Sequence, residues 1–358
     1  MTVLVLHIGS PKTGSSAIQA AVRPTREQGW RIVLANSYLR AVPSGCIATL
    51  YQQPGQLPRV WEQKYQADPS GFARDVRRYR RIMERQLKPR WRSQPSAAFL
   101  SSEYLWTLSL DAIQQLRRDC LELGVRRFLV IAYVRSPVAL YRSALQQHAK
   151  LSTQFRRFRP QRWSYRFRAR LEAWQEAFPD ALVVRPYDRD QLHQCCVVQD
   201  LRHTIQQSLA DAPPLSLKPV RSAVNESVSV EELIAMQELM HRCPPASQEG
   251  SLRRSRALWR QWARLRRLRA GVKGSAVRLD PAVEQLILQR HQSDLDWLAT
   301  TYGVQLGHAA AASNAGDLHR HGEWSEDLSL HDLLDVQPQQ EWLDELRATL
   351  QRCSLPRV

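Results

Sequence analysis

The chain has 358 residues, of which 43% are hydrophobic, so it can form the core of one large α/β domain or of two smaller ones. Its 51 lysines and arginines against 34 acidic residues give a formal net charge of +17. Such a charge favours an anionic partner, such as a nucleic acid, an acidic polysaccharide, a membrane surface or a polyphosphate cofactor.

No apolar run reaches the length of a membrane-spanning helix, and the N-terminal apolar run has no basic segment before it. We therefore expect a cytoplasmic protein without a signal peptide, and peripheral membrane association stays open. The six cysteines show no C-x-x-C spacing, which predicts reduced thiols and neither a disulfide framework nor a zinc site.

The N-terminal stretch predicts a strand, a turn and a helix in succession. Thr2 to Ile8 is a continuous apolar run, typical of a strand that is buried on both faces. A glycine-containing turn follows over Gly9 to Ser16, and helical spacing begins at Ser15, with Ser15 or Ser16 as the expected cap. Backbone N–H groups in this arrangement favour a phosphate or a similarly shaped anion.

The turn differs from a nucleotide-triphosphate P-loop, G-x-x-x-x-G-K-[ST], in the position of its lysine. Gly9 and Gly14 keep the glycine spacing and Ser16 keeps the hydroxyl group, but Ser15 stands where the lysine should be. The lysine lies three residues earlier, at Lys12, so it would approach the phosphate chain from another side.

Strands alternate with helices along the next part of the chain, which predicts βαβ units and a parallel sheet covered on both faces. The expected strands are 31–35, 96–102, 126–134 and 181–185, and the expected helices are 72–87, 111–123, one opened by Ser136 and Pro137, and 165–178. Asp111 is the expected cap of the helix at 111–123. Residues 42–95 differ in composition and predict a helical insertion.

The last third of the chain is basic and predicts helices at 229–241, 252–270, 280–302 and 340–352, with a flexible linker at 309–316. Two arginine-rich segments, 156–170 and 253–269, predict either a basic groove for an anionic glycan or ordinary solvated helix faces.

The remaining candidate site residues lie at the ends of the expected strands. A kinase or ATPase would place an Asp at the end of a buried strand to hold Mg²⁺, but only Glu103 comes near such a position. Instead, Arg135 follows the most apolar strand, and Ser143 lies in the next helix. The planar guanidinium group of an arginine, together with a hydroxyl group, can bind a phosphate monoester.

Together, PKTGSS at 11–16 and the R-x₇-S pair of Arg135 and Ser143 resemble the two cofactor signatures of the sulfotransferases that use 3′-phosphoadenosine 5′-phosphosulfate. This resemblance covers roughly residues 1–192, and Asn225-Glu226-Ser227 resembles a segment of bacterial carbohydrate-type members. Ser15-Ser16 departs mildly from the family's usual Thr-Thr or Ser-Thr.

The resemblance implies a P-loop-like three-layer α/β/α fold with a central parallel sheet. Residues 1–210 would form the sulfotransferase core, and 211–358 would complete or cover the same domain. Lys12, Thr13, Gly14, Ser15 and Ser16 would surround the 5′-phosphosulfate, with Lys12 as the catalytic lysine. Arg135 and Ser143 would hold the 3′-phosphate, and Tyr187 would lie near the nucleotide.

We expect transfer of a sulfuryl group to a hydroxyl group of a polysaccharide or glycolipid, without a metal, with adenosine 3′,5′-bisphosphate as the other product. The general base is Glu103 or His148. Two alternatives stay open: an ATP-dependent P-loop phosphotransferase, and a non-enzymatic nucleic-acid-binding protein, although no nucleic-acid fold signature is present. The acceptor and the oligomeric state do not follow from the sequence.

Overall fold

The structure is a computed structural model, and it describes residues 2–22, 30–33, 45–87, 97–150, 152–215, 217, 228–242, 274–306 and 328–351. The chain divides into two compact units, each built from three segments. Unit 1 comprises 1–136, 166–224 and 293–306, and unit 2 comprises 137–165, 225–292 and 307–358. The expected helix at 252–270, the expected linker, the second arginine-rich segment and residues 225–227 lie outside the described residues.

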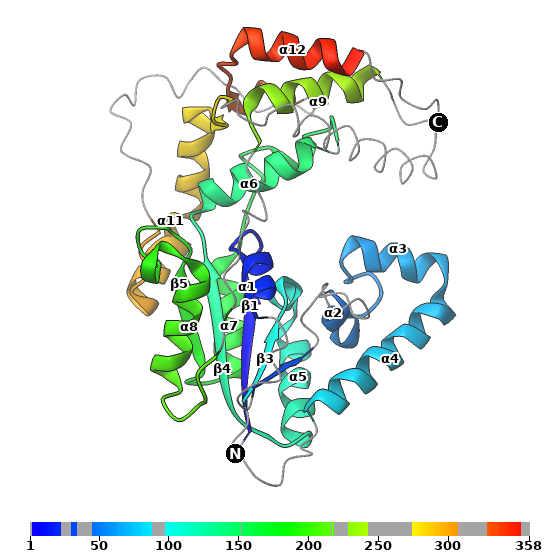
Figure 1. The fold of residues 1–358 in the computed structure, drawn as a ribbon, viewed down its shortest axis with the longest axis vertical. Helices are drawn as coiled ribbons and strands as arrows, with labels where there is room; N and C mark the ends of the chain where they lie inside the picture. The colour runs from blue at the N-terminus through cyan, green and yellow to red at the C-terminus, as the bar shows by residue number, and fades with distance from the viewer. Residues whose placement is uncertain are drawn as a thin grey trace. The chain divides into compact units, whose positions relative to one another are not determined.

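A five-stranded parallel sheet in the order β2-β3-β1-β4-β5 forms the centre of unit 1 (Figure 1). Its strands are β1 (Thr2–Gly9), β2 (Trp30–Val33), β3 (Ala97–Ser101), β4 (Val125–Val134) and β5 (Leu182–Pro186). The expected α/β class with a parallel sheet is confirmed. From β1 the chain passes to β2 and β3 on one side of β1, and it then crosses to β4 and β5 on the other side. The strand order therefore switches direction at β1, and ligands of such sheets bind at this point.

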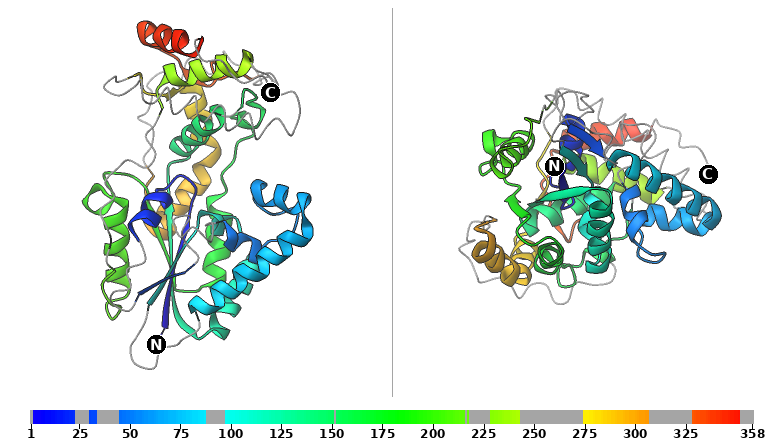
Figure 2. Two further views of the ribbon diagram at one scale, coloured as in Figure 1. Left: turned by 45° about the vertical axis from the view of Figure 1, so that its right-hand side comes forward. Right: turned by 90° about the horizontal axis from the view of Figure 1, so that it is seen from below.

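Helices cover both faces of this sheet, which explains why β1, β3 and the second half of β4 are mostly apolar and buried (Figure 2). On one face, Val3, Val5 and Ile131 pack with Ile18 of α1 (Ser15–Ala21) and Leu201 of α8 (Val197–Ser208) in one apolar cluster. The helices α5 (Leu110–Glu122) and α7 (Phe167–Ala177) contact each other on the opposite face.

Between β2 and β3, unit 1 contains the helical insertion that the sequence predicts. It consists of α2 (Cys46–Tyr51), α3 (Arg59–Ala67) and α4 (Pro69–Leu87), and α4 contacts both other helices and β2. The insertion also contacts η1 (Glu103–Thr107), the short 3₁₀-helix after β3, through α2.

Two expected helix caps are wrong. Gly14, in the left-handed conformation, is the N-cap of α1, and neither Ser15 nor Ser16 caps it because both already lie inside the helix. The N-cap of α5 is Ser109, whose side chain accepts a hydrogen bond from the Ala112 N–H, rather than Asp111, which sits in the first turn. An acidic residue in the first turn interacts favourably with the helix dipole, so the sequence pattern places Asp111 near the start of this helix.

Unit 2 has its own apolar core, built around Tyr141, Leu233, Val283 and Leu346. Its elements are α6 (Pro137–Ala149), η2 (Arg156–Phe158), α9 (Val230–Arg242), the first part of α11 (Pro281–Tyr302), the antiparallel pair of β6 (Arg278–Leu279) and β7 (Leu334–Asp335), and α12 (Gln340–Gln351). The expected helices at 280–302 and 340–352 are thereby confirmed within a residue of their ends.

Within the described ranges, no helix is both long and apolar enough to cross a membrane. Four of the six cysteines are described, and each of these is a free thiol: Cys46, Cys120, Cys195 and Cys196.

Candidate active site

The residues that follow four adjacent strands lie at the carboxyl edge of the sheet in unit 1. β1 is followed by the turn Ser10–Gly14, β3 by Ser102 and Glu103, β4 by Arg135, and β5 by Tyr187. Because these strands are parallel and in register, their ends meet at one edge.

The turn after β1 holds Lys12 in a strained conformation. Lys12 has a φ of 65°, in the left-handed region that residues with a side chain rarely occupy, and Gly9 and Gly14 have φ values of 89° and 78°. The Thr13 hydroxyl donates to the Ser10 carbonyl and the Ser10 N–H donates to the Tyr133 carbonyl at 2.8 Å, so the turn is tied to itself and to β4.

Both glycines of the turn are required by close contacts. A Cβ atom on Gly9 would lie 3.1 Å from the Glu103 Cα atom, and one on Gly14 would lie 3.0 Å from both the Tyr187 ring and Val197. The two glycines therefore let the turn pack against η1 on one side and against the end of β5 and the start of α8 on the other.

Arg135 connects this turn to Tyr187. Its guanidinium group donates to the Lys12 carbonyl at 3.2 Å and lies over the Tyr187 ring, 5.5 Å from the ring centre. The Lys12 and Arg135 cations thus belong to one site, which brings two positive charges to the turn. Since α1 has only seven residues, these side chains rather than the helix dipole supply most of the positive field.

Lys12 and Glu103 affect each other's ionisation. Burial lowers the pKa of Lys12, the Glu103 carboxylate opposes this shift, and Arg135 adds to it. Burial raises the pKa of Glu103, and Lys12 opposes that shift. The site therefore combines a desolvated cation with a carboxyl group that is more basic than an exposed glutamate.

Two hydroxyl groups have unused hydrogen-bonding capacity, one in the turn and one at the start of α1. Ser10 and Ser15 are buried, and among the described residues neither side-chain oxygen has a hydrogen-bond partner. Buried polar atoms are nearly always paired in native proteins, so these hydroxyl groups are available to a bound ligand or water. Ser16, in contrast, is exposed.

Ser143 and His148, two further residues that the sequence singles out, lie on α6 in unit 2. Ser143 is half-buried there. Both ring nitrogens of His148 already have contacts in unit 2, Nε2 with the Gln154 carbonyl and Nδ1 with Arg157, which makes His148 a poor candidate for a general base.

Sequence reasoning missed a buried ionic network beneath the turn. Asp200 on α8 is fully buried and accepts hydrogen bonds from Arg185 at 2.6 and 3.1 Å, from the Tyr133 hydroxyl at 2.8 Å and from the His193 N–H at 2.9 Å. Burial alone would raise the pKa of Asp200, but these hydrogen bonds lower it. The only sequence signal is an aspartate within the apolar pattern Val197, Val198 and Leu201.

A second group of buried polar residues that sequence reasoning missed surrounds His7 of β1. His7 lies on the same face of the sheet as the Asp200 network. Its Nδ1 contacts the Ser101 hydroxyl at 2.7 Å, and Gln19 of α1 donates to Ser101 at 3.3 Å. Burial lowers the pKa of His7 to about 3, so this histidine is neutral and supports the end of β1 without adding charge to the site.

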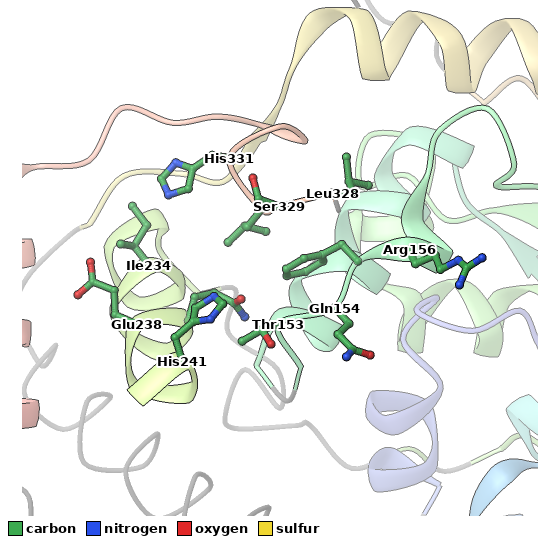
Figure 3. Close-up of a pocket in the computed structure, with 12 residues that line it drawn as sticks. Thr153, Gln154, Arg156, Ile234, Glu238, His241, Leu328, Ser329 and His331 are labelled. Atoms are coloured by element: carbon green, nitrogen blue, oxygen red, sulfur yellow. The ribbon is translucent and has the colours of Figure 1, made fainter. Parts of the chain in front are cut away.

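Unit 2 contains a cavity of about 550 Å³ between α9, the loop after α6 and residues 328–331 (Figure 3). Two polar side chains of its lining are already engaged, because Gln237 donates to the Ala149 and Ser152 carbonyls and Glu238 pairs with Arg347. Arg156 extends away from the other lining residues (Figure 3). The cavity therefore lacks the converging charges that the sheet edge provides.

No known protein family matches the sequence, and no curated protein matches it either. Among the described residues, no three His, Cys, Asp or Glu side chains gather as they would around a metal ion.

Proposed function

We propose that the protein is a sulfotransferase that moves a sulfuryl group from 3′-phosphoadenosine 5′-phosphosulfate to a hydroxyl group of a carbohydrate acceptor, on a P-loop-like sulfotransferase fold. The observation that supports this most is the Lys12 turn, which joins Arg135, Glu103 and Tyr187 at the carboxyl edge of the sheet. The sequence resemblance assigns Lys12, Arg135 and Tyr187 to the donor, and their contacts are compatible with one anionic ligand.

The residues at the turn fit the donor in chemical terms. The buried Ser10 and Ser15 hydroxyl groups can donate to phosphate or sulfate oxygens, and Arg135 offers a planar fork for a phosphate. The Tyr187 ring is held against Gly14 and under Arg135, where it can pack against a nucleoside. The resemblance also assigns Ser143 to the 3′-phosphate, and that assignment stays a prediction.

When bound, the donor supplies an activated sulfuryl group. The oxygen of the acceptor hydroxyl group would form a bond to sulfur while Glu103 accepts the proton of that hydroxyl group. At the same time the bond from sulfur to the phosphate oxygen would break. Lys12 would stabilise the negative charge that develops on that phosphate oxygen. Its desolvation strengthens this effect, because a charge acts more strongly where water is excluded.

The raised pKa of Glu103 suits a general base, because a more basic carboxylate takes up a proton more readily. Asp200 has no direct part in this scheme, since its oxygens are used by Arg185, Tyr133 and His193. It holds the start of α8 and the end of β5 beside the turn.

The test is binding of adenosine 3′,5′-bisphosphate, measured by calorimetry with EDTA present. We expect binding in the absence of Mg²⁺, and a large loss of affinity when the 3′-phosphate is missing. Lys12→Ala should lower the transfer rate by about 10²–10³-fold, whereas Lys64→Ala, at an exposed lysine that pairs with Asp75, should leave the rate unchanged. Binding of Mg-ATP without any preference for a 3′-phosphate would favour a phosphotransferase instead.

A further inference from the structure

Helix α4 of the insertion has five exposed arginines along one side. Arg74, Arg77, Arg78, Arg81 and Arg85 follow the helical spacing, so they occupy about 100° of the helix circumference and extend over about 16 Å of its length. We call this set the arginine stripe. It belongs to neither of the two arginine-rich segments that the sequence analysis singled out.

The opposite side of α4 is buried, which fixes the direction in which the arginine stripe faces. Phe72, Tyr79, Met83 and Leu87 are each no more than 8% exposed. The stripe is therefore held toward solvent. The same burial argues against insertion into a bilayer, since an interfacial helix needs its apolar side free for the acyl chains.

The charges of the arginine stripe are largely uncompensated. Arg74 lies 3.7 Å from Asp68, and both side chains are more than half exposed. Within the described part of the chain, no carboxylate pairs with Arg77, Arg78, Arg81 or Arg85.

Arginines elsewhere in the described chain more often have partners. Arg80, on the inner side of α4, pairs with Asp119 at 2.8 Å. In the arginine-rich segment at 156–170, Arg159 is buried, Arg168 pairs with Glu172 and Arg170 donates to the Thr107 carbonyl. The arginine stripe is thus a more open basic surface than the segment that the sequence suggested.

A series of aromatic contacts connects α4 to the candidate active site within unit 1. Tyr79 packs edge-on against Trp61, with 5.9 Å between the ring centres. Trp61 and Tyr104 both approach Gly45, where a Cβ atom would lie 2.5 and 3.1 Å from them, and Tyr104 directly follows Glu103. The arginine stripe and the proposed general base are therefore carried by packed neighbouring elements.

We propose that the arginine stripe binds a linear acidic polysaccharide along α4, and that such a polysaccharide is the acceptor; the second part rests on the proposed sulfotransferase function. Guanidinium groups repeated at each helical turn can pair with the carboxylate or sulfate groups of successive sugars. A nucleic acid fits less well. Both aromatic residues of α4, Phe72 and Tyr79, are buried, so the exposed side of the helix has no aromatic side chain on which bases could stack.

The experiment compares two triple variants of the full-length protein in binding to polygalacturonate, a linear carboxylated polysaccharide, at several salt concentrations. The stripe variant is Arg77→Gln with Arg81→Gln and Arg85→Gln. The control variant removes the same charge from exposed arginines outside α4, with Arg118→Gln, Arg126→Gln and Arg202→Gln. Thermal unfolding and bisphosphate binding are measured for both variants, to show that the fold and the donor site are intact.

We expect the stripe variant to bind polygalacturonate about tenfold more weakly, with a shallower salt dependence, and the control variant to bind almost as the parent does. Equal losses in the two variants would overturn the proposal, since net charge alone would then explain binding. The proposal would also be overturned if a DNA duplex of matched charge bound more tightly than polygalacturonate and lost the same affinity in the stripe variant. Stripe-dependent polygalacturonate binding without any bisphosphate binding would support the surface and contradict the sulfotransferase.

Discussion

Glu103 packs against Gly9, where burial disfavours its ionised form, and the Lys12 cation opposes this effect without cancelling it. Because burial raises its pKa, the folded chain keeps the Glu103 proton to a higher pH than the unfolded chain does. This difference has opposite consequences for activity and for stability, and both can be measured.

Glu103→Gln should lower the transfer rate by about 10²–10⁴-fold and should remove the rise in rate that accompanies Glu103 ionisation in the parent. In the parent, the free energy of unfolding should fall as the pH rises from the ordinary glutamate pKa of 4.5 to the raised pKa of the folded protein. The variant should lose that dependence and should melt at a higher temperature at neutral pH. Full activity in the variant, measured by sulfuryl transfer to an acceptor, would exclude Glu103 as the base.

At the scale of single elements, the turn after β1 combines a backbone requirement and a packing requirement at Gly14. Gly55 separates the two effects, because it has a similar φ of 88° but no atom within 4 Å of the position of its Cβ. Gly55→Ala should therefore cost only the strain of a left-handed residue, about 1–2 kcal/mol.

Gly14→Ala should cost more than Gly55→Ala, because the new methyl group also meets Tyr187 and Val197 at 3.0 Å. The excess should appear as a larger drop in melting temperature. Since Tyr187 must move, adenosine 3′,5′-bisphosphate should also bind more weakly to Gly14→Ala and equally well to Gly55→Ala. Equal bisphosphate affinity in the two variants would show that the packing around Gly14 has no part in the donor site.

The Asp200 network joins β4, β5 and α8, and its removal should destabilise unit 1. Asp200→Asn leaves Arg185 without its buried carboxylate, which should cost about 3–5 kcal/mol. Asp211→Asn is the matched control, because Asp211 pairs with Arg127 in the same unit but at the solvent-exposed surface, so little change is expected. Chemical denaturation of both variants measures the difference.

The pH dependence of the parent gives a second test of the Asp200 network. Its lowered pKa means that its stabilising contribution is present above the ordinary aspartate value of 3.8 and is lost as the pH falls through the lower pKa of the folded protein. The parent should therefore lose stability in acid below about pH 4, and Asp200→Asn should lose less over that range. Parallel pH profiles for the two proteins would contradict this assignment.

The sequence could predict the site residues that follow strands, because the carboxyl ends of parallel strands share one edge. For that reason the sequence places Lys12, Glu103 and Arg135 at one edge, whereas Tyr187 is assigned through the sulfotransferase resemblance. The strands of unit 1 also follow from the sequence, but α8 (Val197–Ser208) does not. The Asp200 network could not be predicted, because no local sequence pattern pairs an aspartate on a helix with an arginine on a strand. Gly14 as the cap of α1 was also missed, because hydroxyl residues are the usual caps and a left-handed glycine cap depends on the packing of Tyr187.

At the scale of the whole molecule, the chain passes repeatedly between two units that have separate apolar cores. The Val3–Leu201 cluster lies in unit 1 and the Tyr141–Leu346 cluster in unit 2. The second half of α11 is part of unit 1, where Asp294 accepts a hydrogen bond from the Arg168 N–H and the Gln305 carbonyl accepts one from Gln191. The predicted boundary at residue 210 stays a prediction, but the core of unit 1 includes residues well beyond it.

Two cores in one chain predict that thermal unfolding departs from a single two-state transition. The calorimetric enthalpy should exceed the van't Hoff enthalpy, because the two clusters need not melt together. Adenosine 3′,5′-bisphosphate at a hundredfold excess over its Kd should stabilise the unfolding step that includes unit 1 by about 2.7 kcal/mol. Hydrogen exchange identifies that step, since amides of β1 and β4 should become more protected on binding. A single transition with equal enthalpies would show that the two cores unfold as one cooperative structure, and unchanged protection in β1 and β4 would contradict the donor site.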